Sequence, residues 1–141
     1  MNILIDTNVV LDHTLKREPF ASAAYKVLAL DEARFTFHMT ASAVTDMHYI
    51  MRKLVGETAT RQHLTSIFDL FDILDVTVTD CRAALALPMD DYEDALQAIC
   101  ARRAKCAYII TRNEKHYEGS PVPAITPEQF LAEWDNRHAQ P

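Results

Sequence analysis

Short apolar runs alternate along this chain with longer stretches in which apolar residues recur every three or four positions. Runs typical of strands occupy residues 3–5, 34–38, 76–78, 107–111 and 124–125. The longer stretches show helical periodicity. Helices are expected over residues 9–15, 19–30, 42–55, 58–73, 81–87, 90–104 and 127–137. Strands that alternate with helices predict an α/β layer fold with a mainly parallel sheet.

Residues that favour helix starts set the expected boundaries. Pro19 is predicted to be the first residue of its helix, because proline is common at that position. Ser42 is predicted to cap the next helix. Asp90 is predicted to begin a capping box in which Glu93 is the partner.

Length and composition predict one domain over residues 1–141, since no repeat, linker or low-complexity segment divides the chain. With only 2 glycines, the chain has no Gly-rich phosphate loop. Neither a signal peptide nor a membrane-spanning run is present, so the cytoplasm is the expected location. The three cysteines, at positions 81, 100 and 106, have no C-x-x-C spacing and are expected to be reduced thiols.

Acidic residues outnumber basic ones by 20 to 14, which gives a net charge of −6. A protein that only binds nucleic acid usually has a basic surface, so the charge argues against that class. The same charge is compatible with an enzyme whose carboxylates bind a cation.

Polar residues follow two of the predicted strands, as Asp6-Thr7-Asn8 and as Thr111-Arg112-Asn113. Taken singly, such an aspartate is explained as a turn or helix cap. However, the carboxyl ends of parallel strands share one edge of a sheet, where ligands bind. Asp46 interrupts an apolar helical stripe, where a charge is costly unless it is paired or bound to metal. Asp94 lies on a helix that is expected to pack on the sheet.

If Asp6, Asp46 and Asp94 converge, each close pair repels by roughly 4 kcal/mol at about 4 Å and an effective dielectric near 20. A divalent cation offsets that repulsion. Ligands that are all oxygen favour Mg²⁺ or Mn²⁺ over zinc.

Five segments, in this order, resemble the motifs of the PIN domain family. They are Asp6-Thr7-Asn8 for its D-T-N opening, residues 40–46 (TASAVTD) for its S-x-x-x-E/D helix, residues 91–97 (DYEDALQ) for D-x-E-D-A-L-Q, residues 109–117 (IITRNEKHY) for I-V-T-R-N-x-K-D-F, and residues 126–131 (TPEQFL) for T-P-E-E-F-L. Together these segments span nearly the whole chain.

The resemblance implies a three-layer α/β/α fold with a parallel sheet of about five strands and an acidic pocket at the strand ends. It also implies Mg²⁺- or Mn²⁺-dependent cleavage of single-stranded RNA, commonly in a homodimer, and a possible antitoxin partner, since many members are toxins of bacterial toxin–antitoxin pairs. Two positions depart from the family. Asp46 stands where Glu is frequent, and His116 stands where Asp is usual. The second change removes an anionic ligand and leaves undecided whether a second metal is bound. A histidine there could bind metal, donate to phosphate or lie at the pocket rim, and the rim is the favoured position for His116.

The resulting hypothesis is a metal-dependent endoribonuclease in which Asp6, Asp46 and Asp94 bind one cation. Supporting roles beside the cation or its ligands are assigned to Asp91, Asn113, Thr7, Asn8 and Thr111. Arg112 and Lys115 are assigned to RNA phosphates, although exposed loop charges are also common without such a role. The apolar face of the helix over 58–73 would suit a dimer.

Two alternatives stay open. The first is a degenerate PIN domain that binds RNA or a partner protein without cleaving. The second is a phosphoryl-transfer α/β protein. A phosphatase of the haloacid dehalogenase type would have D-x-D where this chain has Asp6-Thr7-Asn8. A receiver domain would have paired acidic residues in its first loop, and this first loop has none.

Overall fold

The computed structural model describes residues 1–139 and contains one parallel sheet. Its strands are β1 (Asn2–Ile5), β2 (Thr36–Thr40), β3 (Asp72–Leu74), β4 (Tyr108–Ile110) and β5 (Ala124–Ile125). They lie in the order β3-β2-β1-β4-β5, and every neighbouring pair is parallel. The predicted α/β fold with a parallel sheet is confirmed.

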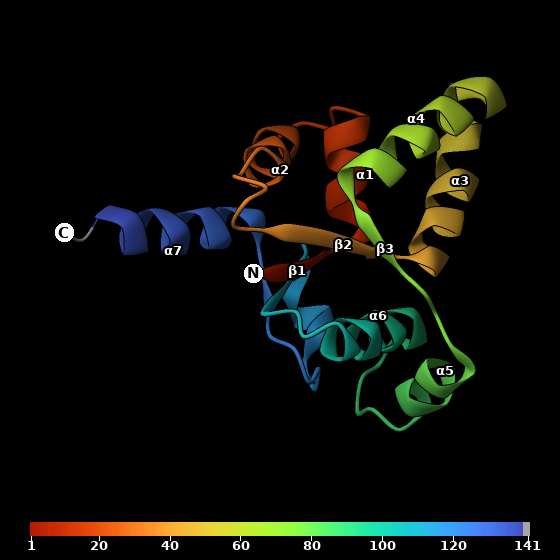
Figure 1. Ribbon diagram of the computed structural model, residues 1–141. Coiled ribbons are helices and arrows are strands. Elements are labelled where there is room, and N and C mark those ends of the chain that lie inside the picture. The colour runs from red at the N-terminus through yellow and green to blue at the C-terminus, as the bar shows by residue number, and fades with distance from the viewer. Residues whose placement is uncertain (140–141) are drawn as a thin grey trace.

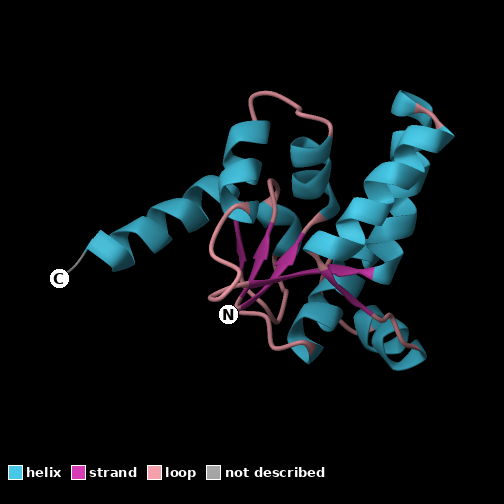
Figure 2. Ribbon diagram, turned by 45° about the horizontal axis from the view of Figure 1, so that its top comes forward, coloured by secondary structure: helices cyan, strands magenta, loops and turns pink. Residues whose placement is uncertain are grey.

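Helices cover both faces of this sheet, which makes three layers (Figure 1). On one face lie α1 (Thr7–Thr14), α2 (Ala21–Leu28), α3 (Ala41–Val55) and α4 (Glu57–Leu70). On the other face lie α5 (Val78–Leu85) and α6 (Tyr92–Arg103). A short 3₁₀ helix, η1 (Glu114–Tyr117), follows β4, and α7 (Pro127–Ala139) extends beyond the sheet beside α2 (Figure 2). None of the helices in the described part of the chain has the length and apolar character needed to span a membrane.

Residues Ile3 to Ile5 of the central strand β1 are fully buried, and their side chains alternate between the two layers. Ile3 and Ile5 pack in the core under α1 to α4, whereas Leu4 packs in the core under α6. Successive side chains of any strand point to opposite faces of the sheet in this way. Because helices cover both faces, every position of β1 between Ile3 and Ile5 must be apolar, and this produced the run that predicted the strand.

The prediction of a strand at residues 76–78 is wrong. The strand is Asp72–Leu74, and Val78 is already the first residue of α5. Thr77 caps this helix by accepting a hydrogen bond from the Asp80 N–H at 3.1 Å, and the Asp80 carboxylate accepts one from the Thr77 N–H at 2.9 Å. The β-branched residues at 76–78 therefore lie at a capping box at the start of α5. The apolar pattern alone could not distinguish this helix start from a strand.

The starts of α2 and α3 also differ from the prediction. Helix α2 begins at Ala21, so Pro19 lies in the preceding turn. Thr40, and not Ser42, caps α3, because its hydroxyl accepts a hydrogen bond from the Ala43 N–H at 3.2 Å. Strand β2 therefore runs directly into α3, which brings the first turns of this helix to the carboxyl edge of the sheet.

Helix α6 is capped by Asp91, and the predicted capping box from Asp90 is wrong. The Asp91 carboxylate accepts a hydrogen bond from the Asp94 N–H at 3.0 Å. The cap lies one residue later than predicted, so Glu93 is the second residue of the helix and does not complete a box. This shift leaves the Glu93 side chain available for another role.

Candidate metal centre

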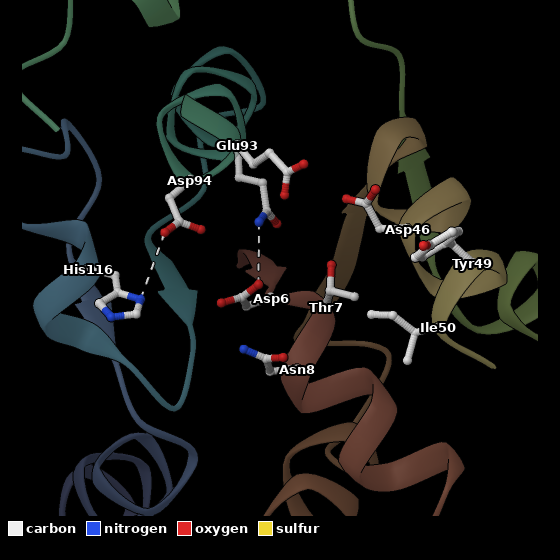
Figure 3. Close-up of a pocket in the computed structure, with 10 residues that line it drawn as sticks. Asp6, Thr7, Asn8, Asp46, Tyr49, Ile50, Glu93, Asp94 and His116 are labelled. Carbon is white, nitrogen blue, oxygen red and sulfur yellow. Dashed lines mark hydrogen bonds and ion pairs between the residues drawn. The ribbon is translucent and has the colours of Figure 1, made fainter. Parts of the chain in front are cut away.

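A cavity of about 390 Å³ opens at the carboxyl end of β1 (Figure 3). The chain reaches the two neighbours of β1 from opposite faces of the sheet, β2 through α1 and α2 and β4 through α5 and α6. Ligands of parallel sheets bind where the connections diverge in this way. The Asp6 N–H donates to the Ile110 carbonyl at 2.9 Å and holds the ends of β1 and β4 together.

The cavity wall contains six of the residues singled out from the sequence. They are Asp6, Thr7, Asn8, Asp46, Asp94 and His116. Four further wall residues were not predicted. They are Tyr49, Ile50, Glu93 and Gln97.

Asp6 is held in place by two side chains from other elements. The Thr111 hydroxyl, fully buried after β4, donates to Asp6 Oδ2 at 2.8 Å, and Gln97 Nε2 of α6 donates to Oδ1 at 3.3 Å. Although Asp6 precedes α1, its carboxylate makes no capping hydrogen bond. The local explanation of this aspartate as a helix cap therefore fails, and the carboxylate is oriented by the tertiary structure.

Asp94 lies near Asp6 and carries a perturbed carboxyl group. Burial, followed by the negative charges of Asp6 and Asp91, raises the pKa of Asp94 from 3.8 to about 6. His116 Nδ1, 4.0 Å from Asp94 Oδ2, and a hydrogen bond from Tyr117 offset part of this rise. The negative charge at this end of the cavity is thus only partly balanced by the protein.

Tyr117 and Gln97 lie behind the two carboxylates. Burial and the charges of Asp6 and Asp94 raise the pKa of the Tyr117 phenol well above its usual range, so it stays a neutral donor. Gln97 Nε2 donates to Tyr117 Oη at 3.3 Å. Gln97 Oε1 is buried and has no hydrogen-bond partner among the described residues.

Asp46 and Glu93 form a second acidic pair. Figure 3 shows Asp46 on α3, across the cavity from Asp94, with Asp6 between them. Burial raises the pKa of Asp46. The charge of Asp46, followed by burial and the charge of Asp91, raises the pKa of Glu93. Within residues 1–139, no three side chains of Asp, Glu, His or Cys are close enough to form a ready metal cage.

The donor set nevertheless fits a hard divalent cation. Asp6 and Asp94 supply carboxylate oxygens whose mutual repulsion a cation would relieve, and Gln97 Oε1 is a buried acceptor without a partner. Mg²⁺ usually retains several waters and takes only one or two carboxylates from a protein. A pair of carboxylates with a third across the cavity therefore meets the requirement without a closed cage.

The other predicted residues lie outside the cavity wall. Arg112 Nε is 2.9 Å from Oδ2 of the buried Asp12, and its guanidinium carbon lies 4.1 Å from the centre of the Phe20 ring. Asn113 is exposed just before η1, and Lys115 is exposed within η1. The assignment of Arg112 and Lys115 to substrate, and of Asn113 to support, stays a prediction.

Three of the four cavity residues that the prediction missed lie three or four positions after a predicted carboxylate, which is the spacing of one helix face. Gln97 follows Asp94 by three residues, and Tyr49 and Ile50 follow the α3 carboxylate by three and four, so each shares its face. Glu93 had no such signal, because its side chain was assigned to the capping box. Its position became clear only from the location of the cap.

Sequence and structure comparisons relate this chain to a known protein family. Residues 2–115 match the sequence model of the PIN domain. Ribonuclease VapC1 from Aquifex aeolicus (strain VF5) is 21% identical, over 94% of this chain and 95% of that protein.

Several solved structures share the fold. VapBC2 from Rickettsia felis, bound to a DNA fragment, has a TM-score of 0.73 at 16% identity, over 89% of this chain and 98% of that chain. A toxin–antitoxin complex from Klebsiella pneumoniae has a TM-score of 0.67 at 22% identity, over 89% of this chain and 97% of that chain. Since residues 2–115 make up most of the chain and include every residue of the acidic cavity except His116, the chain belongs to the PIN domain family.

Proposed function

We propose that this protein is a metal-dependent endoribonuclease that hydrolyses phosphodiester bonds of single-stranded RNA. Asp6, Asp46 and Asp94 bind Mg²⁺ or Mn²⁺, with Asp6 and Asp94 as the pair on one side of the cavity. The observation that carries this proposal is that one cavity collects Asp6, Asp46 and Asp94 from three parts of the fold, and the raised pKa of Asp94 beside Asp6 indicates negative charge that the protein leaves unbalanced. The relationship to a protein named ribonuclease VapC1 supports RNA as the substrate.

When bound, the cation would lower the pKa of a water molecule and neutralise charge that develops on the phosphate. The protein contributes orientation and proton acceptors. Thr111 and Gln97 fix the two oxygens of Asp6, so this carboxylate needs no rearrangement when substrate arrives. On the opposite side, the charge of Asp46 raises the pKa of Glu93, and the Glu93 carboxylate is therefore suited to accept the proton that the attacking water loses.

Cations near the rim suit a polyanionic substrate. Tyr49 lines the cavity, Lys53 Nζ lies 3.9 Å from the centre of its ring, and the Arg52 guanidinium carbon lies 5.4 Å from it. We assign these two cations, together with Arg112 and Lys115 as predicted from the sequence, to backbone phosphates of the RNA.

The test compares Asp94→Asn with Asp90→Asn, which removes the same charge from an exposed residue outside the cavity. Cleavage of a labelled single-stranded RNA is measured with Mn²⁺, with Mg²⁺ and with EDTA. We expect cleavage by wild type and by Asp90→Asn in either metal, no cleavage in EDTA, and a loss of at least about 100-fold for Asp94→Asn. Full activity of Asp94→Asn would remove the assignment.

A Mn²⁺ titration followed by thermal unfolding separates the enzyme from the non-catalytic alternative. The melting temperature of wild type should rise with Mn²⁺, and that of Asp6→Ala should not. RNA binding without a response to Mn²⁺ and without cleavage would support a degenerate PIN domain that only binds.

We also propose an antitoxin partner, by analogy with the toxin–antitoxin complex from Klebsiella pneumoniae, and a homodimer. Helix α4 exposes Phe68 and Leu70, with relative accessibilities of 59% and 36%, and so offers an apolar surface for self-association. Light scattering during size-exclusion chromatography is expected to give a dimer for wild type and a monomer for Phe68→Asp. A monomeric wild type would contradict the dimer.

A further inference from the structure

A second cavity, of about 240 Å³, adjoins the acidic one. The two cavities share Asp46, Glu93 and Gln97 as a common wall. The far side of the second cavity is formed by the starts of α3 and α6, including Ser42 and Tyr92. A ligand in this cavity would therefore lie directly beside any group held in the acidic one.

The Tyr92 ring is exposed but held in place. Its hydroxyl donates to the Cys81 carbonyl of α5 at 3.0 Å, while 43% of the residue remains accessible. In the described part of the chain, no ring or cation contact covers this ring. Tyr49 differs, because Lys53 lies over its ring at 3.9 Å. Of the two tyrosines at these cavities, Tyr92 is the one whose ring has no cation over it among the described residues, which leaves the ring open to a planar ligand.

Among the residues that the structure describes, the lining of the second cavity has no cationic side chain that could bind a phosphate, and it suits a base. Asp46 and Glu93 on the shared wall repel an anion. Leu96 supplies an apolar contact, and Ser42, whose hydroxyl shares a hydrogen bond with Thr40 at 3.1 Å, supplies a polar group at the edge. An aromatic ring, an apolar side chain and a few polar groups are the usual contacts of an unpaired nucleobase.

We propose that the second cavity binds the base of a nucleotide next to the cleaved phosphodiester, with Tyr92 stacked on that base. This inference rests on the proposed ribonuclease function. A paired base could not enter the cavity, so the site selects single-stranded substrate, and stacking tolerates all four bases. Tyr92 binds substrate here and takes no part in proton transfer.

The test uses one short single-stranded RNA with a single cleavage site, and two versions in which the base on either side of that site is missing. Wild type, Tyr92→Leu and Tyr92→Phe are compared, with Tyr25→Leu as the control, because Tyr25 is an exposed tyrosine that lines neither cavity. Binding is measured by fluorescence anisotropy and cleavage by kcat and KM. Melting temperatures check that each variant is folded.

We expect Tyr92→Leu to weaken binding and raise KM by about tenfold on intact RNA, with little change in kcat, as for the loss of one stacked base. One of the two abasic RNAs should show the same loss with wild type, and Tyr92→Leu should add nothing to it. Tyr92→Phe, which keeps the ring, and Tyr25→Leu should stay within about threefold of wild type.

The outcomes separate the two proposals. Cleavage that is unaffected by Tyr92→Leu and by both missing bases would overturn the base site and leave the ribonuclease intact. Binding that depends on Tyr92 and on the base, without cleavage, would support the base site and overturn the ribonuclease. Absence of both binding and cleavage would overturn both.

Discussion

Replacing Asp94 with asparagine should make the protein more stable at neutral pH while it removes the proposed activity. Asparagine keeps the shape of the side chain and an oxygen that can accept the hydrogen bond from Tyr117. It removes a negative charge that lies beside Asp6. Burial, followed by repulsion from Asp6 and Asp91, raises the pKa of this group. In the unfolded chain the charge is solvated and far from both carboxylates, so the cost of burial and the repulsion are specific to the folded state.

The pKa of Asp94 gives the size of the effect. A rise from 3.8 to about 6 corresponds to roughly 3 kcal/mol at about 1.4 kcal/mol per pKa unit. The carboxylate is partly open to the cavity, and solvent screening reduces this to about 1.5 kcal/mol. For a chain of this length, Asp94→Asn should raise the melting temperature by about 3–6 °C at pH 7.

The sign also predicts a pH dependence. Because the folded pKa of Asp94 is raised, the folded chain binds a proton before the unfolded chain does as pH falls. The wild-type protein therefore regains stability relative to Asp94→Asn between about pH 7 and pH 4. Below the unfolded pKa of 3.8 both states are protonated, and the difference between the two proteins should vanish.

Urea unfolding of wild type, Asp94→Asn and the exposed control Asp90→Asn, at several pH values in EDTA, measures this difference. EDTA is needed because a bound cation would stabilise only wild type. An Asp94→Asn protein that is no more stable than Asp90→Asn at pH 7, or whose advantage persists unchanged at pH 4, would refute the reasoning.

Three further perturbations follow from particular contacts. Thr111→Val removes the hydroxyl that donates to Asp6 at 2.8 Å, so Mn²⁺ affinity measured by calorimetry should fall about 10- to 100-fold, and unchanged affinity would contradict this. Asp12→Ala leaves two arginines without their buried carboxylate, so urea unfolding should show a loss of about 3 kcal/mol, whereas a loss below about 1 kcal/mol would contradict the buried pairing. Gly119→Ala places a Cβ 2.6 Å from a backbone oxygen at φ +85°, whereas Gly56→Ala at φ +87° meets no atom within 4 Å. Thermal unfolding should therefore show a clearly larger loss at 119, and equal losses would contradict the clash.

The periodicity of apolar residues predicted most elements of the fold correctly. Residues 3–5 and the run that ends at Ile110 are buried from both sides, so their apolar character is required by the layers that cover them. The error at residues 76–78 arose where burial is incomplete. Strand β3 is at the edge of the sheet, and its exposed Asp72 weakened the apolar signal that marked the inner strands.

Part of the candidate site was also visible in the sequence. A carboxylate directly after a buried strand lies at the carboxyl edge of a parallel sheet, which sufficed to place Asp6. Asp94 was expected on a helix that packs on the sheet, and helical spacing from Asp94 would have found Gln97, which lines the same cavity. These inferences need only the local geometry of one element.

Which side chains meet was decided by the tertiary structure. Asp6 and Thr111 are 105 positions apart and are brought together by the pairing of Ile5 with Ile110 in the β1–β4 register. The same strand order brings Arg112 to Asp12, a contact that no motif predicted.

There is one physical reason why the sequence predicts the elements of the fold but not the contacts between their side chains. A buried position of a helix or strand favours an apolar residue whatever its neighbours are. Apolar residues therefore recur along the sequence with the period of the element. Contacts between side chains on different elements depend on strand order, register and the precise position of caps, and these are set by packing of the whole molecule. The sequence therefore determined the layers and the edge where carboxylates gather, and the structure decided that Asp6 pairs with Asp94 while Asp46 lies across the cavity with Glu93.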